Sequence, residues 1–173
     1  IYNRYNHFFV NHLDSLSLED PLFAVQLVLD SLAAEPTHFT AMLPSTPHVG
    51  PRIVEWRSGT CRELTDAVVY TLRSLGIPCG VDFMVLRGDN NVTHYWNFFL
   101  DRNVNTTITE YADANFRKPT DLHDNPKGKV YRNTYSLNKT MYDNMRKISD
   151  VIFPSFNYPR FIDVTSIYAD KFN

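Results

Sequence analysis

Residues 60–75 constrain the fold more than any other part of the chain, because they predict the clearest helix in the sequence. The predicted buried face follows the i, i+3, i+4, i+7 spacing of an amphipathic helix, with Leu64, Ala67, Val68, Thr71, Leu72 and Leu75. Gly76 suits the position just after a helix C-terminus, and Pro78 prevents the helix from continuing. Cys61 therefore lies in the first turn of this helix.

A second helix is predicted on the N-terminal side, between Asp20 and Pro36. Asp20 and Pro21 are typical of an N-cap and a first helical position, and Pro36 ends the run. The residues between them are apolar almost all round, which indicates a helix packed within the protein. Residues 37–58 then contain three prolines and a glycine, so we expect a long loop there.

Three strands are predicted after the central helix, at residues 81–86, 94–100 and 106–111. Turn-forming residues separate them at 88–91 and 101–103, so the connections are short. Short connections between successive strands favour an antiparallel meander, and with the two helices they predict an α+β fold.

The C-terminal third of the chain gives fewer signals. Residues 115–138 are polar and predicted irregular, and residues 140–151 predict a short helix. The ending, residues 158–168, resembles the first strand of a further domain. The chain also opens on Ile1 rather than Met, so we expect one domain over residues 1–173 that belongs to a longer parent protein.

Charge and hydropathy argue against two kinds of interaction, with nucleic acid and with the interior of a membrane. Net charge is −2 and no run of Lys or Arg exceeds two residues, so nothing in the chain is suited to neutralising a phosphate backbone. We therefore expect no nucleic acid. No apolar stretch reaches the length of about 18 residues that a membrane helix needs, so no span is expected in this segment.

The chain has two cysteines, Cys61 and Cys79, which are too few for a disulfide framework. They flank one predicted helix, which should hold them too far apart to bond to each other. We expect Cys79 to be a buried residue at the start of a strand, where it behaves as a small hydrophobe. Neither C-x-x-C nor H-E-x-x-H occurs, so no metal and no cofactor are expected.

Cys61 is the candidate nucleophile. A thiol reacts as the thiolate, and the unpaired N–H groups and dipole of a helix N-terminus favour negative charge there. The same N–H groups can hold a developing oxyanion. Gly59, two residues upstream, would let a substrate approach the backbone closely.

His94 is the candidate base, because a thiol nucleophile needs a base within hydrogen-bond reach. It begins the second predicted strand, beside Tyr95 and Trp96. On the next strand Glu110 would lie beside the imidazole and orient it, with Asp113 in reserve for that role. Each residue alone has an ordinary structural explanation, and their order on a helix and successive strands is what favours a catalytic one.

Two motifs, in this order, resemble the transglutaminase-like superfamily of papain-type cysteine enzymes. Residues 55–78 are similar to the family's Gly-x-Cys, helix and Leu-Arg-x-Leu-Gly-Ile-Pro, and the His-Tyr-Trp that begins at His94 is similar to its His-x-Trp. The matching stretch is residues 54–113. The resemblance implies an α+β, papain-like fold in which the nucleophile's helix packs on an antiparallel sheet, with N-terminal helices. It also implies a Cys-His-Asp triad, whose third position here is Glu110 or Asp113.

The same resemblance implies acyl transfer or hydrolysis on peptide or side-chain amides, with a protease or amidase favoured over a cross-linking enzyme. A peptide or protein substrate would be the partner, and Trp56, Gly59, Tyr95 and Trp96 are the candidates for lining its cleft. Ordinary aromatic packing is the alternative for both tryptophans. The alternative function is an inactive transglutaminase-like domain that binds protein or glycan. An exported bacterial type is implied, with an extracytoplasmic location in the periplasm or at the cell surface.

Overall fold

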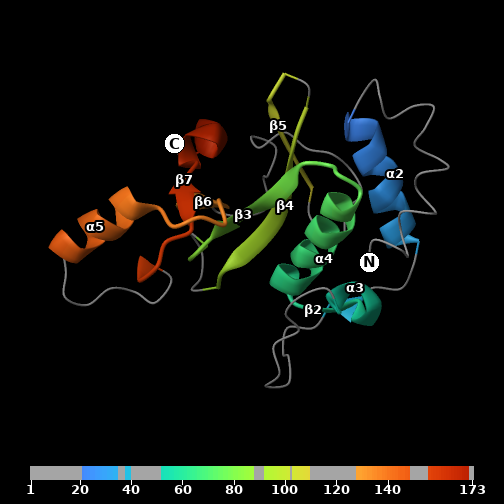
Figure 1. The fold of residues 1–173 in the computed structure, drawn as a ribbon, viewed down its shortest axis with the longest axis horizontal. Coiled ribbons are helices and arrows are strands. Elements are labelled where there is room, and N and C mark those ends of the chain that lie inside the picture. Colours follow the sequence, from blue (N-terminus) through green and yellow to red (C-terminus); the bar gives the residue numbers. More distant parts are fainter. Residues whose placement is uncertain are drawn as a thin grey trace.

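The computed structural model describes residues 21–34, 38–39, 52–87, 92–101, 103–109, 128–148 and 156–171. In this part of the chain the fold is α+β, centred on a five-stranded antiparallel sheet with strand order β5-β4-β3-β6-β7. The strands are β3 (Cys79–Met84), β4 (His94–Leu100), β5 (Thr106–Thr109), β6 (Val130–Asn133) and β7 (Phe161–Asp163). Figure 1 shows β3 and β4 at the centre, with helix α4 (Cys61–Ser74) beside them.

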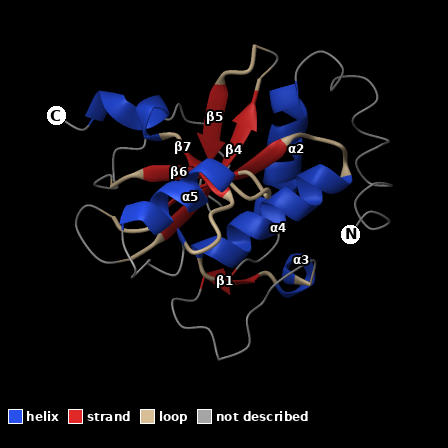
Figure 2. Ribbon diagram, turned by 60° about the vertical axis from the view of Figure 1, so that its left-hand side comes forward, coloured by secondary structure: helices blue, strands red, loops and turns tan. Residues whose placement is uncertain are grey.

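The other described elements surround this sheet. They are the helices α2 (Pro21–Ala33), α3 (Ile53–Trp56) and α5 (Lys139–Ile148), the 3-10 helix η3 (Thr165–Lys171), and the short parallel pair β1 (His38–Phe39) and β2 (Ser58–Gly59). Figure 2 shows α4 running across the strands, with α3 and β1 below it in this view. Within the described ranges, no helix is long and apolar enough to cross a membrane.

Helix α4 starts where it does because of a capping box. The Thr60 hydroxyl accepts a hydrogen bond from the Arg62 backbone N–H at 3.3 Å, and the Thr60 backbone N–H donates to Glu63 Oε2 at 2.9 Å. At the other end Gly76 has a φ of 80°, the left-handed conformation that ends many helices. The helix predicted over residues 60–75 is therefore confirmed to within one residue at each end.

The face of the sheet that α4 covers carries the larger core. Asn97 of β4 joins the two layers, because its Nδ2 donates to the Thr65 carbonyl oxygen at 3.1 Å. The core draws on α2, α3, α4 and the strands, and its buried members are Val25, Val28, Leu29, Ile53, Val54, Val68, Val69, Leu72, Cys79, Val81 and Phe99. Burying each large side chain of this kind contributes about 1.5–3 kcal/mol, so packing holds α4 on the sheet.

The opposite face carries a second core, which the C-terminal segment closes. Its buried members are Met84, Trp96, Phe98, Ile108, Val130, Val164 and Tyr168. Tyr168 of η3 is fully buried there, and Val164 is 5% exposed. The residues after β7 are therefore an integral part of this fold.

Several predicted elements are confirmed. The helix between residues 20 and 36 is α2, the helix over 140–151 is α5, and the three predicted strands form the antiparallel meander β3-β4-β5. The first of these strands begins two residues earlier than predicted, at Cys79, which is buried at the strand start as expected.

Three predictions are wrong. The expected loop over 37–58 contains helix α3 and the β1–β2 pair, and the polar stretch over 115–138 contains β6, which pairs with β3. The ending is not the first strand of a further domain, because β7 pairs with β6 in the same sheet.

Asp20, Glu110 and Asp113 lie outside the described residues.

Candidate active site

Cys61 is the first residue of α4 and is partly exposed. Cys61 is the first helical residue because Thr60, the residue before it, is the N-cap of the capping box. The backbone N–H groups of the first turn point toward this end of the helix and favour negative charge there. The predicted placement of the thiol at a helix N-terminus is confirmed, and both cysteines of the chain are free.

The structure places the Tyr95 ring against Arg62, the residue that follows Cys61 in the first turn of α4. The Arg62 guanidinium lies 5.0 Å from the centroid of the Tyr95 ring, and its Nε donates to Asp66 Oδ2 at 2.9 Å. Burial raises the pKa of Tyr95, Arg62 opposes that rise, and the negative charge of a Cys61 thiolate adds to it. Burial likewise raises the pKa of Asp66 against the opposing effect of Arg62. Tyr95 is therefore a neutral hydroxyl near neutral pH, on the face of the sheet that α4 covers.

His94 is the first residue of β4 and pairs with Met84 of β3. Side chains alternate along a strand, so Tyr95 faces α4 whereas His94 and Trp96 start from the opposite face. The His94 and Trp96 rings are 5.7 Å apart between centroids. The structure thus places the imidazole at the start of β4, on the face of the sheet opposite the one that α4 covers. A Cys61–His94 pair stays a prediction, and it requires the imidazole to reach around the strand end.

The third member of the predicted triad has no described position. Glu110 follows Thr109, the last described residue of β5, and Asp113 lies further along the same undescribed stretch. Thr109 pairs with Asn97, so β5 does lie next to the strand that begins at His94. The orienting role of either carboxylate stays a prediction.

The four predicted cleft residues differ in their surroundings. Trp96 is fully buried in the second core, which favours the packing alternative, and its role in a cleft stays a prediction. Gly59 is buried too, and a Cβ there would lie 2.5 Å from the Glu63 Cβ, so its space serves the capping box. Trp56 is 48% exposed at the end of α3, and Tyr95 is half-buried against Arg62.

A cavity of about 400 Å³ lies near the end of the sheet where β3 ends and β4 begins. A row of ring contacts leads toward it from Tyr95, which stacks on Phe83 at 5.5 Å between centroids. Phe83 in turn contacts Tyr131 at 5.9 Å, and Tyr131 contacts Phe156 at 5.6 Å. The cavity is lined by Val85, Leu86, Arg87, Gly128, Lys129, Tyr131 and Phe156. Its walls are mostly apolar, with two cationic side chains among them.

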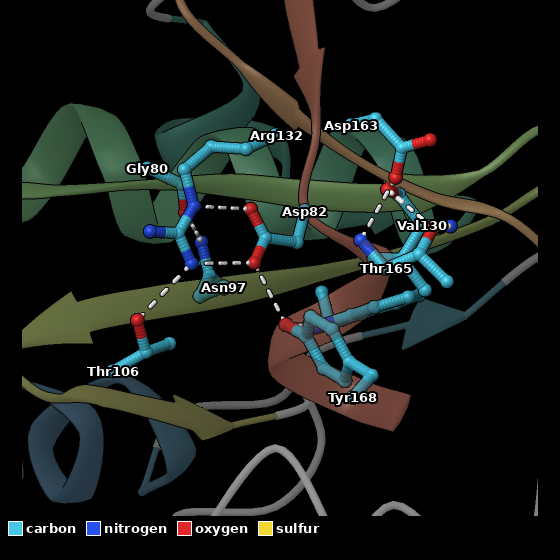
Figure 3. A network of polar contacts seen from close by, with 10 residues as sticks. Gly80, Asp82, Asn97, Thr106, Val130, Arg132, Asp163, Thr165 and Tyr168 are labelled. Atoms are coloured by element: carbon cyan, nitrogen blue, oxygen red, sulfur yellow. Dashed lines mark hydrogen bonds and ion pairs between the residues drawn. The ribbon is translucent and has the colours of Figure 1, made fainter. Parts of the chain in front are cut away.

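Sequence reasoning missed a buried polar network on the face opposite α4. Asp82 is fully buried on β3 and accepts hydrogen bonds from Arg132 at 2.9 and 2.8 Å (Figure 3). Tyr168 donates its hydroxyl proton to Asp82 Oδ2 at 2.7 Å and accepts from Trp96 Nε1 at 2.9 Å. The available signal was Asp82 itself, because a carboxylate inside an apolar strand needs a buried partner.

Among the described residues, no group of three or more His, Cys, Asp or Glu side chains is arranged to hold a metal ion. The described residues offer the Cys61 thiol, the His94 imidazole, the Tyr95 hydroxyl and the backbone N–H groups of the first turn of α4.

Comparisons with known proteins give a distant structural similarity. No protein-family model and no curated protein matches the chain. It is similar to a solved structure, the periplasmic domain of TgpA from Pseudomonas aeruginosa bound to ethylmercury, with 20% sequence identity and a TM-score of 0.48. The match covers 65% of this chain and 45% of that one, so the chain spans less than half the length of that domain. At this identity the likeness concerns the arrangement of elements and says nothing of chemistry.

Proposed function

We propose that this chain is a thiol-dependent enzyme of transglutaminase-like type that transfers or hydrolyses acyl groups of peptide or side-chain amides. The observation that carries the proposal is the partly exposed Cys61 at the capped N-terminus of α4, packed on an antiparallel sheet whose strand β4 begins at His94. A thiol nucleophile needs a base within hydrogen-bond reach, and His94 is the candidate for that base. A papain-like arrangement of the whole domain is part of the proposal.

In the first step the Cys61 thiolate adds to the amide carbonyl, and the backbone N–H of Cys61 contributes to holding the oxyanion. The C–N bond then breaks, and the amine leaves with the proton that His94 took from the thiol. In the second step water, or an amine, attacks the thioester carbonyl and gives a proton to His94. The C–S bond then breaks, the acyl product leaves, and the released Cys61 thiolate takes that proton back from His94. Glu110, with Asp113 in reserve, orients the imidazole. Hydrolysis is favoured, so the product of a peptide substrate is a carboxylate.

The substrate side of the site is formed by aromatic residues. Tyr95 packs against Arg62 in the first turn of α4, and the exposed Trp56 ends the short helix just upstream of Cys61. The cavity next to Tyr131 offers room for an apolar side chain of the substrate. No metal or organic cofactor is needed for these steps.

The test is the pH dependence of Cys61 alkylation by iodoacetamide, followed by mass spectrometry in the wild type and in His94→Ala. Fast modification that persists well below pH 8 and is lost in His94→Ala would support a thiolate–imidazolium pair. Cys79 serves as an internal control, because burial raises its pKa to about 11. Slow modification that follows an ordinary thiol titration in both proteins would refute the proposal.

One observation favours a second candidate, a transglutaminase-like domain that binds protein or glycan without catalysis. His94 and Tyr95 start from opposite faces of β4, and the thiol lies on the Tyr95 side. If the imidazole stays on the Trp96 face, the thiol lacks its base. The alkylation profile separates the two candidates, and an ordinary profile would direct the search to binding partners.

The location and wider context are part of the same proposal. The resemblance of residues 54–113 supports an extracytoplasmic bacterial protein with further domains in the parent chain. Fractionation of cells that express the full-length gene product tests the location, and a cytoplasmic product would contradict it.

A further inference from the structure

The buried network on the far face of the sheet has one hydroxyl at its centre. Tyr168 reaches from η3 to two different strands, since it donates to Asp82 on β3 and accepts from Trp96 on β4. Figure 3 shows Asp82 between Arg132 on one side and Tyr168 on the other. All three of Asp82, Trp96 and Tyr168 are fully buried. A hydroxyl that both donates and accepts in a dry site has little freedom to rotate.

The direction of this chain of hydrogen bonds is fixed by Arg132. Its guanidinium donates to both oxygens of Asp82, which keeps the carboxylate an acceptor and leaves Oδ2 to receive the Tyr168 proton. The guanidinium also lies 3.6 Å from the centroid of the Phe98 ring and donates to the Thr106 hydroxyl at 3.3 Å. Strands β4, β5 and β6 and the helix η3 are thus linked to Asp82 on β3, through Arg132 and Tyr168. The Trp96 indole is held at the end of this chain of bonds.

Trp96 is also the ring against which His94 lies. The two centroids are 5.7 Å apart with an angle of 38° between the ring planes, and both side chains start from the same face of β4. In addition, the Trp96 and Tyr168 rings meet edge to face at 5.6 Å. The charged and titratable groups of the network behind Trp96 are Asp82 on β3, Arg132 on β6 and Tyr168 on η3.

We propose that Tyr168 is a positioning residue for His94, which it acts on through the Trp96 indole. This rests on the proposed function, in which His94 is the base. The Tyr168 hydroxyl fixes the Trp96 ring, and this ring limits where the His94 imidazole can lie. The 3-10 helix η3 thereby influences the active site without contacting it. Neither Tyr168 nor Trp96 touches the substrate.

The test compares Tyr168→Phe, which removes the hydroxyl and keeps the ring, with Tyr158→Phe, whose side chain is 70% exposed. The first readout is the NMR titration of the His94 ring signals, assigned by their loss in His94→Ala. Tyr168→Phe should shift the His94 titration midpoint, and Tyr158→Phe should leave it unchanged. An unchanged His94 titration in folded Tyr168→Phe would overturn the proposal.

The second readout is the rate of Cys61 alkylation as a function of pH. Tyr168→Phe should lower the rate near neutral pH by roughly tenfold, which is typical of coupling through a packed side chain. In a His94→Ala background the same substitution should have no further effect, because Tyr168 acts through His94. An equal loss in both backgrounds would show a merely structural role and would sink the idea.

The two readouts separate this inference from the proposed function. If His94→Ala alkylates like the wild type, the proposed function fails, and the NMR titration alone still decides whether Tyr168 positions His94. Thr165→Val provides a second variant, because it releases the start of η3 from the Val130 backbone N–H, 3.0 Å away, without touching the network. It should move the His94 titration in the same direction, and no movement would count against the proposal.

Discussion

The buried ion pair between Arg132 and Asp82 provides the sharpest test of how the sheet is held together. Its side chains are 14% and 0% exposed, and two hydrogen bonds of 2.9 and 2.8 Å join them. Arg132→Met keeps most of the side chain's volume and leaves the carboxylate with one donor, Tyr168. Removing one partner of a buried pair costs about 3–5 kcal/mol, because the remaining charge stays in an apolar interior. We expect a loss of that size in the free energy of unfolding.

The control is Lys129→Met, which removes another cation from a neighbouring pair. Lys129 Nζ lies 2.7 Å from Asp163 Oδ2, but the two side chains are 68% and 37% exposed. Water already screens such a pair, so this variant should unfold much as the wild type does. Urea denaturation followed by circular dichroism measures both, with equal m values as the check on two-state behaviour. Equal losses in the two variants would refute the reasoning.

The pH dependence of Arg132→Met gives a second criterion. Burial raises the pKa of Asp82, and the hydrogen bonds and charge of Arg132 oppose that rise. Without Arg132 the rise is larger, so the folded state holds a proton that the unfolded state has already lost. The deficit relative to the wild type should therefore be full at neutral pH and shrink as the pH falls toward the carboxyl's unfolded pKa. A deficit that grows on acidification would contradict this account.

Three further predictions concern α4 and the strand that follows it. Thr65 and Thr71 are both fully buried on α4, but only the Thr71 hydroxyl donates to a carbonyl, at 2.9 Å, whereas Thr65 Oγ1 has no partner within the described residues. Thr71→Val should lower the free energy of unfolding, measured by urea denaturation, by about 1 kcal/mol, and Thr65→Val should leave it nearly unchanged. A larger loss in Thr65→Val than in Thr71→Val would contradict this account. Gly76→Ala should cost about 1–2 kcal/mol through its φ of 80° alone, since a Cβ there meets no atom within 4 Å, and Gly76→Asn should cost less. Cys79, with a pKa raised to about 11 by burial, should be thiolate to roughly one part in a thousand at pH 8 and should alkylate long after Cys61 in native protein; early labelling would show that it is exposed.

The sequence predicted the elements whose stabilising contacts are local. Helix α4 carries its own signals, from the capping residue Thr60 to Gly76, and the short turns between β3, β4 and β5 keep their pairing close in sequence. Strand β6 was missed because its partners are β3 and β7, both far away in the chain, and its own residues include polar side chains. The polar Arg132 on that strand is explained only by Asp82, 50 residues earlier. Non-local pairing of this kind leaves no local pattern to read.

The site was predicted in part for a similar reason. The helix position of Cys61 follows from capping chemistry, which is local. The face on which His94 lies depends on which side of β4 the helix covers, and residues 95–100 are mostly apolar on both sides because both are buried. An alternating pattern would have shown the helix face, and its absence left the direction of His94 open. Glu63 shows the opposite case, because its partner Thr60 is near enough for the sequence to suggest the pair.

The two faces of β4 make a final prediction about which side chain governs the thiol. Tyr95 lies on the Cys61 side, but burial raises its pKa, so near neutral pH it is an uncharged hydroxyl that can donate a hydrogen bond and cannot act as the base. His94 can take the thiol proton at that pH, provided that the imidazole reaches around the strand end. His94→Ala should therefore slow Cys61 alkylation at pH 7 much more than Tyr95→Phe does, with Tyr142→Phe on α5 as the matched control. If Tyr95→Phe has the larger effect, the face that α4 covers determines the reactivity of Cys61, and His94 belongs to the packing of Trp96 instead.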